Sequence, residues 1–291
     1  MRRDREVDPS AMLREIEEHR ITHAIYVPAV VAFLQMVPNA HDHDLSSMRL
    51  VLYGASPITE DVLRGAMAQF SSAEFVQVYG LTETTGAVVA LPPEDHDPEN
   101  RPELLRSAGK PYPWVEMRIV GDDGVDVADG EIGEVCLKGP QIMVGYWNKP
   151  EETARALDDE GWFRSGDAGY RQDGYLFLHD RVKDMIVTGG ENVYPAEVEN
   201  AIMGCPGVAD VAVIGIPDDK WGEAVKAIIV KAPDTEVTPQ AVISWTRERI
   251  AGFKVPKSVD FADELPRNPS GKILKKDLRA PYWADQERQI G

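Results

Sequence analysis

The spacing of apolar residues over the first 106 positions alternates between the period of a helix and that of a strand. Asp8 followed by Pro9 is typical of a helix N-terminus. Met12, Leu13 and Ile16 then fall on one face of that helix. Further along, the β-like runs are Thr22–Val27, Leu50–Tyr53 and Glu74–Val78, and the helical patterns between them are Pro28–Met36 and Thr59–Phe70. Because strands that alternate with helices form parallel sheets, we expect an α/β arrangement.

The pattern changes twice beyond this point. Between residues 107 and 182 it is all-β, with short runs such as Val115–Val120 and Glu134–Lys138, and a hairpin turn predicted at Gln172–Gly174. A small barrel or distorted sheet beside the parallel one would have this pattern. Residues 183–291 mix both element types: helices should begin at Pro195 and after Thr238, and strands are expected at Val208–Ile216, Ala224–Val230 and Val259–Phe261.

We therefore predict a fold of two domains. Residues 1–182 would be the α/β part (1–106) and the β-barrel portion (107–182) of a truncated large domain. Residues 183–291 would be a small, mobile α+β C-terminal domain. A chain of 291 residues, 43% of them hydrophobic, can bury both cores.

Composition narrows the classes of function. The 31 basic and 49 acidic residues give a net charge of −18, which disfavours non-specific binding to nucleic acid or anionic lipid. Cys136 and Cys205 offer neither a disulfide framework nor metal-ligand spacing. No apolar run approaches the ~18 residues of a membrane span, and no signal-peptide core follows Met1. We expect a soluble, cytoplasmic protein that holds anionic substrates through local groups.

Small and hydroxyl-bearing residues follow two of the predicted parallel strands, where ligands of such sheets bind. Gly54–Ser56 follows the first strand and Tyr79–Gly86 the second. Glycine lets a phosphorylated ligand approach the backbone, Tyr79 offers a face for stacking, threonine hydroxyls can bond phosphate, and Glu83 can hold a divalent cation. The competing interpretation is that these residues only form turns and cap helices.

A dense group of charges, Asp180–Asp184, lies between two β-like runs. It is either a solvated loop or a joint between domains that holds an anionic ligand. Ahead of it, Asp167 directly follows a glycine, which suits the binding of two ribose hydroxyls, although acidic residues in turns are often only turn formers. Beyond it, Thr188–Asn192 is predicted to be a flexible loop. Lys272 should lie on an exposed loop, where a lysine usually only aids solubility.

Two other clusters are expected to be structural. His41–Asp44 contains metal-ligating residue types, but no second ligand cluster accompanies it, so a solvated loop is the better interpretation. Tyr146, Trp147 and Trp162 are expected in the core or at the rim of the predicted barrel.

Five segments occur in a characteristic order: Tyr79–Glu83, Arg164–Asp167, Asp180–Asp184, Gly189–Glu199 and Asn268–Lys272. Together they resemble the adenylate-forming superfamily of acyl-CoA synthetases, luciferases and peptide-synthetase adenylation domains, and within it the bacterial fatty-acid–CoA ligases. The resemblance implies activation of a carboxylic acid by ATP to an acyl-adenylate and transfer of the acyl group to the thiol of coenzyme A. It also implies magnesium as a cofactor.

The resemblance further implies roles for the matching residues near the nucleotide. Thr82 would bond the α-phosphate and Glu83 would hold magnesium. The residues that would border adenine and the acyl group are Gly54, Ala55, Ser56, Tyr79 and Gly80, with Tyr79 stacking on adenine.

Other roles follow for residues further along the chain. Asp167 would bind the ribose hydroxyls, with Arg181 beside it, and Lys183 would be the hinge of the small domain. Lys272 would reach the carboxylate and α-phosphate during adenylation. The residues that would line the pantetheine tunnel are Gly189 and Gly190.

One feature of the superfamily has no counterpart in this sequence: an upstream loop rich in Ser, Thr and Gly that ends in Lys and holds the β- and γ-phosphates. We therefore expect a truncated chain whose sheet exposes an edge and an apolar face, which favours association of chains or low solubility. A non-catalytic adenylate- or CoA-binding fragment, a luciferase-like oxidase and a carrier-protein-loading enzyme remain as alternatives.

The hinge assignment predicts an asymmetric effect of Lys183→Pro in a full-length enzyme. Proline fixes one backbone dihedral, so it should freeze the joint and slow thioester formation more than adenylate formation. Pyrophosphate release without CoA and acyl-CoA formation with CoA report the two half-reactions separately. Equal losses in a folded variant would count against the hinge.

Overall fold

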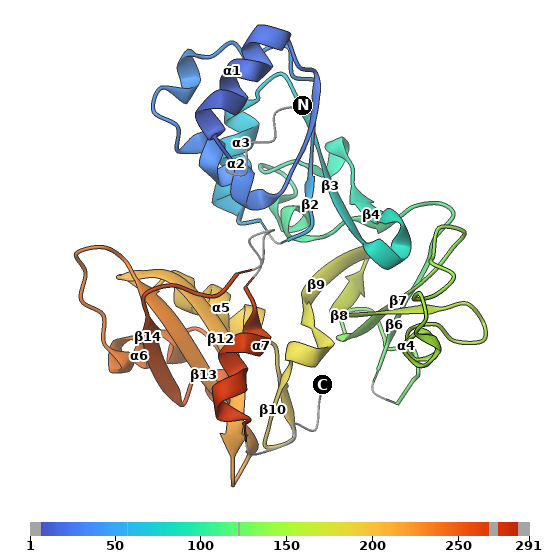
Figure 1. Ribbon diagram of the computed structural model, residues 1–291, viewed down its shortest axis with the longest axis vertical. Helices are drawn as coiled ribbons and strands as arrows, with labels where there is room; N and C mark the ends of the chain where they lie inside the picture. The colour runs from blue at the N-terminus through green and yellow to red at the C-terminus, as the bar shows by residue number, and fades with distance from the viewer. Residues whose placement is uncertain (1–6, 57, 122, 268–272, 285–291) are drawn as a thin grey trace. The chain divides into compact units, whose positions relative to one another are not determined.

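The computed structural model describes residues 7–56, 58–121, 123–267 and 273–284, and it divides into two compact units (Figure 1). The first unit contains residues 1–165 and 169–178, and the second contains residues 166–168 and 179–291. The division therefore falls at His179, ahead of the predicted hinge Lys183, and groups Asp167 with the second unit.

A five-stranded sheet in the order β1-β2-β3-β4-β5 forms the first part of unit 1. β1, β2 and β3 pair in parallel, as the alternating pattern predicted, whereas β4 and β5 are added antiparallel. The strands are β1 (His23–Tyr26), β2 (Leu50–Gly54), β3 (Glu74–Leu81), β4 (Gly86–Leu91) and β5 (Lys110–Pro111), and the helices are α1 (Pro9–His19), α2 (Pro28–Gln35) and α3 (Glu60–Gln69).

Local hydrogen bonds explain where two of these helices begin. The Asp8 carboxylate accepts from the backbone N–H of Ala11 at 3.0 Å, and Pro9 occupies the first turn of α1. Thr59 caps α3 in the same way, its hydroxyl accepting from the N–H of Val62 at 3.4 Å. The capped start predicted for the first helix is therefore confirmed.

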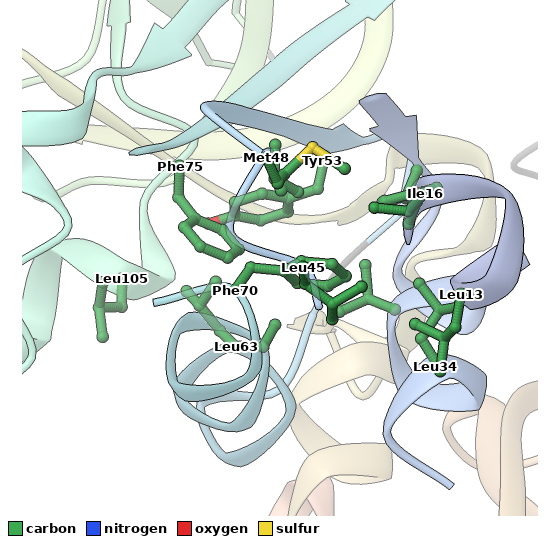
Figure 2. Packing of buried hydrophobic residues seen from close by; sticks show 14 residues of the cluster. Leu13, Ile16, Leu34, Leu45, Met48, Tyr53, Leu63, Phe70, Phe75 and Leu105 are labelled. Carbon is green, nitrogen blue, oxygen red and sulfur yellow. The ribbon is translucent and has the colours of Figure 1, made fainter. Parts of the chain in front are cut away.

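All three helices pack against the same face of the sheet and form its core (Figure 2). Alternate strand residues point toward the helices, as the pleat of a half-buried sheet requires. The buried side chains that the figure labels are Leu13, Ile16, Leu34, Leu45, Met48, Tyr53, Leu63, Phe70, Phe75 and Leu105. This packing fixes β2 and β3 as neighbours, so the segments that follow them lie at one edge of the sheet.

Apolar residues on the opposite face of the sheet are less covered. Leu50 and Leu52 are half-buried, and the side chain of Ile25 on β1 is 71% exposed. β1 is also an end strand of the sheet that the described residues form. The exposed edge and apolar face expected from the sequence are therefore present.

The second part of unit 1 is an antiparallel-type sheet in the order β6-β7-β8-β9, whose last strand continues into unit 2. Its described strands do not close into a barrel, so the distorted-sheet form of the prediction holds. Asp173 and Gly174, with φ of 52° and 82°, form the two-residue turn expected between β8 and β9. The strands are β6 (Glu116–Val120), β7 (Gly133–Lys138), β8 (Phe163–Gln172) and β9 (Tyr175–Arg181).

One helix interrupts the stretch that was predicted to be all-β. α4 (Pro150–Ala156) begins with a proline in its first turn and carries Glu151 and Glu152 there. Proline at that position and acidic residues near the helix N-terminus both stabilise a helix start. The all-β prediction was wrong for these residues, because this local signal is short and lies between strands.

Unit 2 has an α+β fold. Its sheet has the order β11-β10-β13-β12, and β14 pairs in parallel with β13. Val198 and Ile202 of α5 and Val242 of α6 pack on this sheet in one buried cluster. The elements are β10 (Ile186–Thr188), β11 (Glu191–Val193), β12 (Val208–Asp218), β13 (Gly222–Lys231), β14 (Ser258–Ala262), α5 (Pro195–Met203), α6 (Pro239–Arg247) and α7 (Lys275–Arg279).

The predicted flexible loop at Thr188–Asn192 is a tight hairpin instead. Thr188 pairs with Glu191 across the turn, and the two residues between them are glycines with φ of 63° and 83°. Two successive residues with positive φ match the right-handed twist of a hairpin, which glycine allows without strain. None of the described helices has the length and apolar character needed to cross a membrane.

The exposed strand edge predicts that Ile25→Lys reduces self-association of the chain. A charge on an end strand disfavours pairing of that edge with a second chain. The aliphatic contact that Ile25 would bury between two chains, about 1.5–3 kcal/mol, would also be lost, and the dimer dissociation constant would rise roughly tenfold or more. Sedimentation velocity over a concentration series measures this.

Val125, which is 59% exposed outside the strands, provides the control. Val125→Lys adds the same charge without touching the edge. If both substitutions weaken association equally, net charge rather than the edge is responsible.

Candidate functional site

Glycine at the ends of β2 and β3 is required by the strands themselves. A Cβ on Gly54 would lie 2.1 Å from the carbonyl oxygen of Val78, and one on Gly80 would lie 1.9 Å from that of Gly86. The pairing of β3 with β4 also shifts its register between Tyr79 and Gly80. Close backbone approach explains both glycines without a ligand, although such bulges often occur beside active sites.

The residues that follow Gly54 are exposed and conformationally unusual. Ala55 has a φ of 69°, in the left-handed region that non-glycine residues rarely adopt, and Ser56 beside it is exposed. Strain of this kind is concentrated at functional sites. Ala55 and Ser56 therefore present accessible groups at the end of β2, next to the end of β3.

The threonines after β3 have different environments. Thr84 is fully buried, and its hydroxyl accepts from the N–H of Leu81 at 2.9 Å and donates to the carbonyl of Gly86 at 2.6 Å. The Thr85 hydroxyl donates to the carbonyl of Gln141 at 2.8 Å. Thr82 is exposed, and its hydroxyl has no hydrogen bond within the described part of the chain. Of the three, Thr82 has the hydroxyl that is available to a ligand.

A distant segment holds Glu83 in place. The Tyr146 hydroxyl donates to Glu83 Oε1 at 2.8 Å, and the N–H of Met143 donates to the Glu83 carbonyl at 2.7 Å. The side-chain amide of Gln141 donates to the carbonyl of Thr84 at 3.0 Å. Sequence reasoning assigned Tyr146 to the barrel core or rim, and no local pattern links it to Glu83, 63 residues away.

The residues around Glu83 fit a magnesium ion that is bound together with a nucleotide. Across the described ranges, no three His, Cys, Asp or Glu side chains gather as a metal cluster. Mg²⁺ is typically held by one or two carboxylates plus substrate phosphates, and a hydrogen bond to the ligating carboxylate orients it. Glu83, oriented by Tyr146, matches this pattern.

Tyr79 is more buried than a stacking platform needs to be. Its side chain is 9% exposed and packs in a cluster with Val89, Ile119 and Leu176. Its proposed stacking on adenine is therefore limited to whatever part of the ring that cluster leaves accessible.

The structure brings Asp167 and Arg181 together, as the resemblance implied. Arg181 Nε lies 2.7 Å from Asp167 Oδ1, and the Asp167 side chain is only 13% exposed. Gly166 has a φ of 68°, and no atom lies within 4 Å of the position that a Cβ would occupy. Glycine is needed there for backbone conformation, which turns the chain so that Asp167 meets the guanidinium.

The predicted hinge and tunnel residues lie in unit 2. Lys183 is exposed on a 3-10 turn, Val182–Asp184. Gly189 donates its N–H to the carbonyl of Trp221 at 2.8 Å, and a Cβ there would lie 2.7 Å from the indole ring, so packing also favours glycine. Gly190 is exposed beside it. Lys272 lies outside the described residues.

The His41–Asp44 loop makes polar contacts at the surface. His43 Nδ1 lies 2.8 Å from Glu17 Oε2, and Asp44 pairs with Arg20 at 3.2 Å. A cavity of about 560 Å³ borders this loop, α2 and α3, and none of the predicted site residues lines it. The candidate site is therefore the strand-end region, not this cavity.

Comparison with known proteins relates both parts of the chain to one group of enzymes. The profile described as "AMP-binding enzyme" matches residues 1–147, and that of "AMP-binding enzyme C-terminal domain" matches residues 197–272.

Individual relatives agree with this. A fatty acid–[acyl-carrier-protein] ligase of Streptomyces coeruleorubidus is 44% identical over 94% of this chain and 52% of its own. A long-chain-fatty-acid–CoA ligase of Mycobacterium tuberculosis is 44% identical over 92% of this chain and 52% of its own. The structure of an amide bond synthetase from Marinactinospora thermotolerans superimposes with a TM-score of 0.84 at 37% identity, covering 95% of this chain and 55% of that one. The chain thus spans about half the length of the curated relatives it matches.

The different environments of Thr84 and Thr82 predict that substitution of Thr84 destabilises the fold, whereas substitution of Thr82 does not. Thr84→Val should lower the free energy of unfolding by about 1–3 kcal/mol, since it leaves the partly buried N–H of Leu81 without the hydroxyl that accepts its hydrogen bond. Thr82→Val, at an exposed position, should change it by less than about 0.5 kcal/mol. Urea unfolding of the two variants tests this, and the reverse ranking would refute the division of roles between the two hydroxyls.

Proposed function

Because the chain belongs to the family of AMP-binding enzymes, we propose that it is part of an ATP-dependent acid–CoA ligase. Such an enzyme activates a fatty or related carboxylic acid as an acyl-adenylate and passes the acyl group to the thiol of coenzyme A. Fatty-acid ligases among the relatives support the acid class.

The observation that carries the proposal is the turn after β3. It combines an exposed hydroxyl on Thr82 with a carboxylate on Glu83 that Tyr146 orients, beside the exposed Ala55 and Ser56. Binding of a nucleoside triphosphate requires a hydrogen-bond donor to a phosphate oxygen and an anionic ligand for the bound metal ion, and the turn offers both. The turn keeps both outward because Thr84 satisfies the backbone from within.

The first chemical step brings two anions together, because a carboxylate attacks the α-phosphate of ATP. Thr82 would donate its hydroxyl to an α-phosphate oxygen, and Glu83 would hold Mg²⁺, which neutralises phosphate charge when bound. Lys272 would supply a movable positive charge between the anions. A bond forms between a carboxylate oxygen and the α-phosphorus, the bond from that phosphorus to the bridging oxygen of the β-phosphate breaks, and pyrophosphate leaves.

Asp167 and Arg181 are proposed to hold the ribose. A carboxylate with two oxygens can accept from both ribose hydroxyls, and the guanidinium, whose Nε lies 2.7 Å from Asp167 Oδ1, orients it. The mobile domain beyond Lys183 would then present Gly189 and Gly190 to the pantetheine arm for the second step. The thiol of the acceptor is the nucleophile in that step, so no protein nucleophile is required.

The proposal also covers the molecule that accepts the acyl group, the cellular compartment and the association of chains. We propose coenzyme A, while the 44% identity to an acyl-carrier-protein ligase makes a carrier protein the second candidate. Luciferase-like oxidation would instead consume O₂. The two buried cysteines form no disulfide, which supports a reducing, cytoplasmic setting. The exposed edge at β1 supports association of chains.

Calorimetry with an acyl-sulfamoyl adenosine tests adenylate binding. Asp167→Asn should weaken it about ten- to a hundredfold, since hydrogen bonds to a charged group contribute about 1.5–3 kcal/mol. Asp129→Asn is the matched control, because Asp129 Oδ1 faces Arg171 Nε at 2.8 Å in the same geometry. If Asp167→Asn binds as tightly as the unaltered chain, the ribose assignment fails.

Turnover separates an enzyme from a binding fragment. Release of AMP from ATP, fatty acid and Mg²⁺ is measured with CoA, with a carrier protein, and with O₂ alone. CoA-dependent AMP release supports the ligase. Tight binding of the analogue with no turnover by this chain or by an upstream-extended version would leave the non-catalytic function.

A further inference from the structure

Lys275 lies between two carboxylates in the interior of unit 2. Its Nζ is 3.3 Å from Asp180 Oδ2 and 3.0 Å from Glu199 Oε1, and the side chains are 11%, 10% and 18% exposed, respectively. Burial alone would lower the pKa of Lys275, but Glu199 and Asp180 outweigh it, so the pKa lies above its ordinary value. The lysine is therefore charged and needs an anion.

The two carboxylates have different additional anchors. Asp180 Oδ2 also accepts from the N–H of Ala196 at 2.9 Å, at the start of α5. Glu199 Oε1 accepts from the N–H of Val213 on β12 at 2.7 Å. Each anion therefore ties Lys275 to a different piece of backbone.

The decisive feature is where these groups lie relative to Lys183. Asp180 precedes Lys183 in the chain, whereas Ala196, Glu199 and Lys275 all follow it. A rotation about the backbone of Lys183 therefore changes the position of Asp180 relative to its partners, while Glu199 stays with Lys275. Asp180, Ala196, Glu199 and Lys275 all belong to unit 2, so these contacts lie within one compact unit.

We propose that Asp180 is a positioning residue that latches the pivot, because it holds the segment ahead of Lys183 to Lys275 and to the Ala196 amide. When Lys183 rotates, Asp180 leaves Lys275 and the Ala196 amide, and Glu199 alone neutralises the lysine. The inference rests on the pivot role that the proposed function gives to Lys183.

A second carboxylate makes such a latch reversible. Removing the only partner of a buried charge typically costs several kcal/mol, which would lock the pivot. Because Glu199 remains, opening costs the loss of one of the two anions of Lys275 and of the Ala196 hydrogen bond, but it leaves no buried charge without a partner. Asp184 and Arg279, paired at 2.8 Å, both lie beyond the pivot and move together.

Tryptic cleavage after Lys183 measures opening without any substrate. Lys183 is exposed, and release of the segment around it raises the cleavage rate in proportion to the open population. Cleavage after Lys231, exposed at the end of β13 in the same unit, serves as an internal reference for general unfolding. The measured quantity is the ratio of the two rates, resolved by mass spectrometry.

Asp180→Asn should raise this ratio about 5- to 30-fold, the factor by which one or two kcal/mol shifts a population. Glu199→Gln should lower it or leave it unchanged, because Asp180 then becomes the only counter-charge of Lys275. Both amides retain an acceptor for the backbone N–H groups, so the substitutions remove charge alone.

The matched control is a lysine of similar burial that, like its carboxylate partner, lies beyond the pivot, so that rotation does not separate the pair. Lys226 is 8% exposed and pairs with Asp260 at 2.8 Å, so Asp260→Asn should leave the ratio unchanged. A ratio that rises equally in Asp180→Asn and Glu199→Gln would show a purely structural network and overturn the latch, as would no change in Asp180→Asn. Since no adenylate is involved, failure of the ligase assignment would not alter the readout.

Discussion

The hydrogen bonds of one buried hydroxyl support the proposed site. Thr84 satisfies the backbone of Leu81 and Gly86 and so lets the chain reverse from β3 into β4 within a few residues. Because the turn is closed from inside, Thr82 and Glu83 face outward with their polar groups available. The segment at Gln141–Tyr146 then fixes the orientation of that turn from outside. The groups of the proposed site therefore depend on Thr84, a residue that is itself fully buried.

Close backbone contact places a second constraint on the same region. Gly54 and Gly80 leave no room for a Cβ because neighbouring carbonyl oxygens occupy that space. Glycine in such segments is usually explained by the ligand, but here the sheet alone demands it. Packing of the strand ends therefore accounts for these two glycines, whether or not a ligand binds beside them.

Buried charge organises unit 2 in a comparable way. Asp180 and Asp184 stand on either side of Lys183, and both are paired with residues of α7. Ion pairs in a low-dielectric interior resist separation unless another partner is available. The exposed Lys183 is thus held between two anchored positions, only one of which lies ahead of it in the chain. This geometry supports the proposed latch at Asp180, which the composition of the charged segment did not predict.

Elements whose signals are local can be predicted from the sequence alone. The apolar period, the caps at Asp8 and Thr238, and the turn at Gln172–Gly174 predicted most helices and strands, since such signals act within a few residues. The resemblance of the ordered segments to the superfamily predicted that Asp167 and Arg181 lie side by side. Only the tertiary structure decided that Tyr146 orients Glu83, that Thr84 is internal while Thr82 is exposed, and that Lys275 bridges Asp180 and Glu199. These depend on contacts between residues far apart in the chain, which no local pattern encodes.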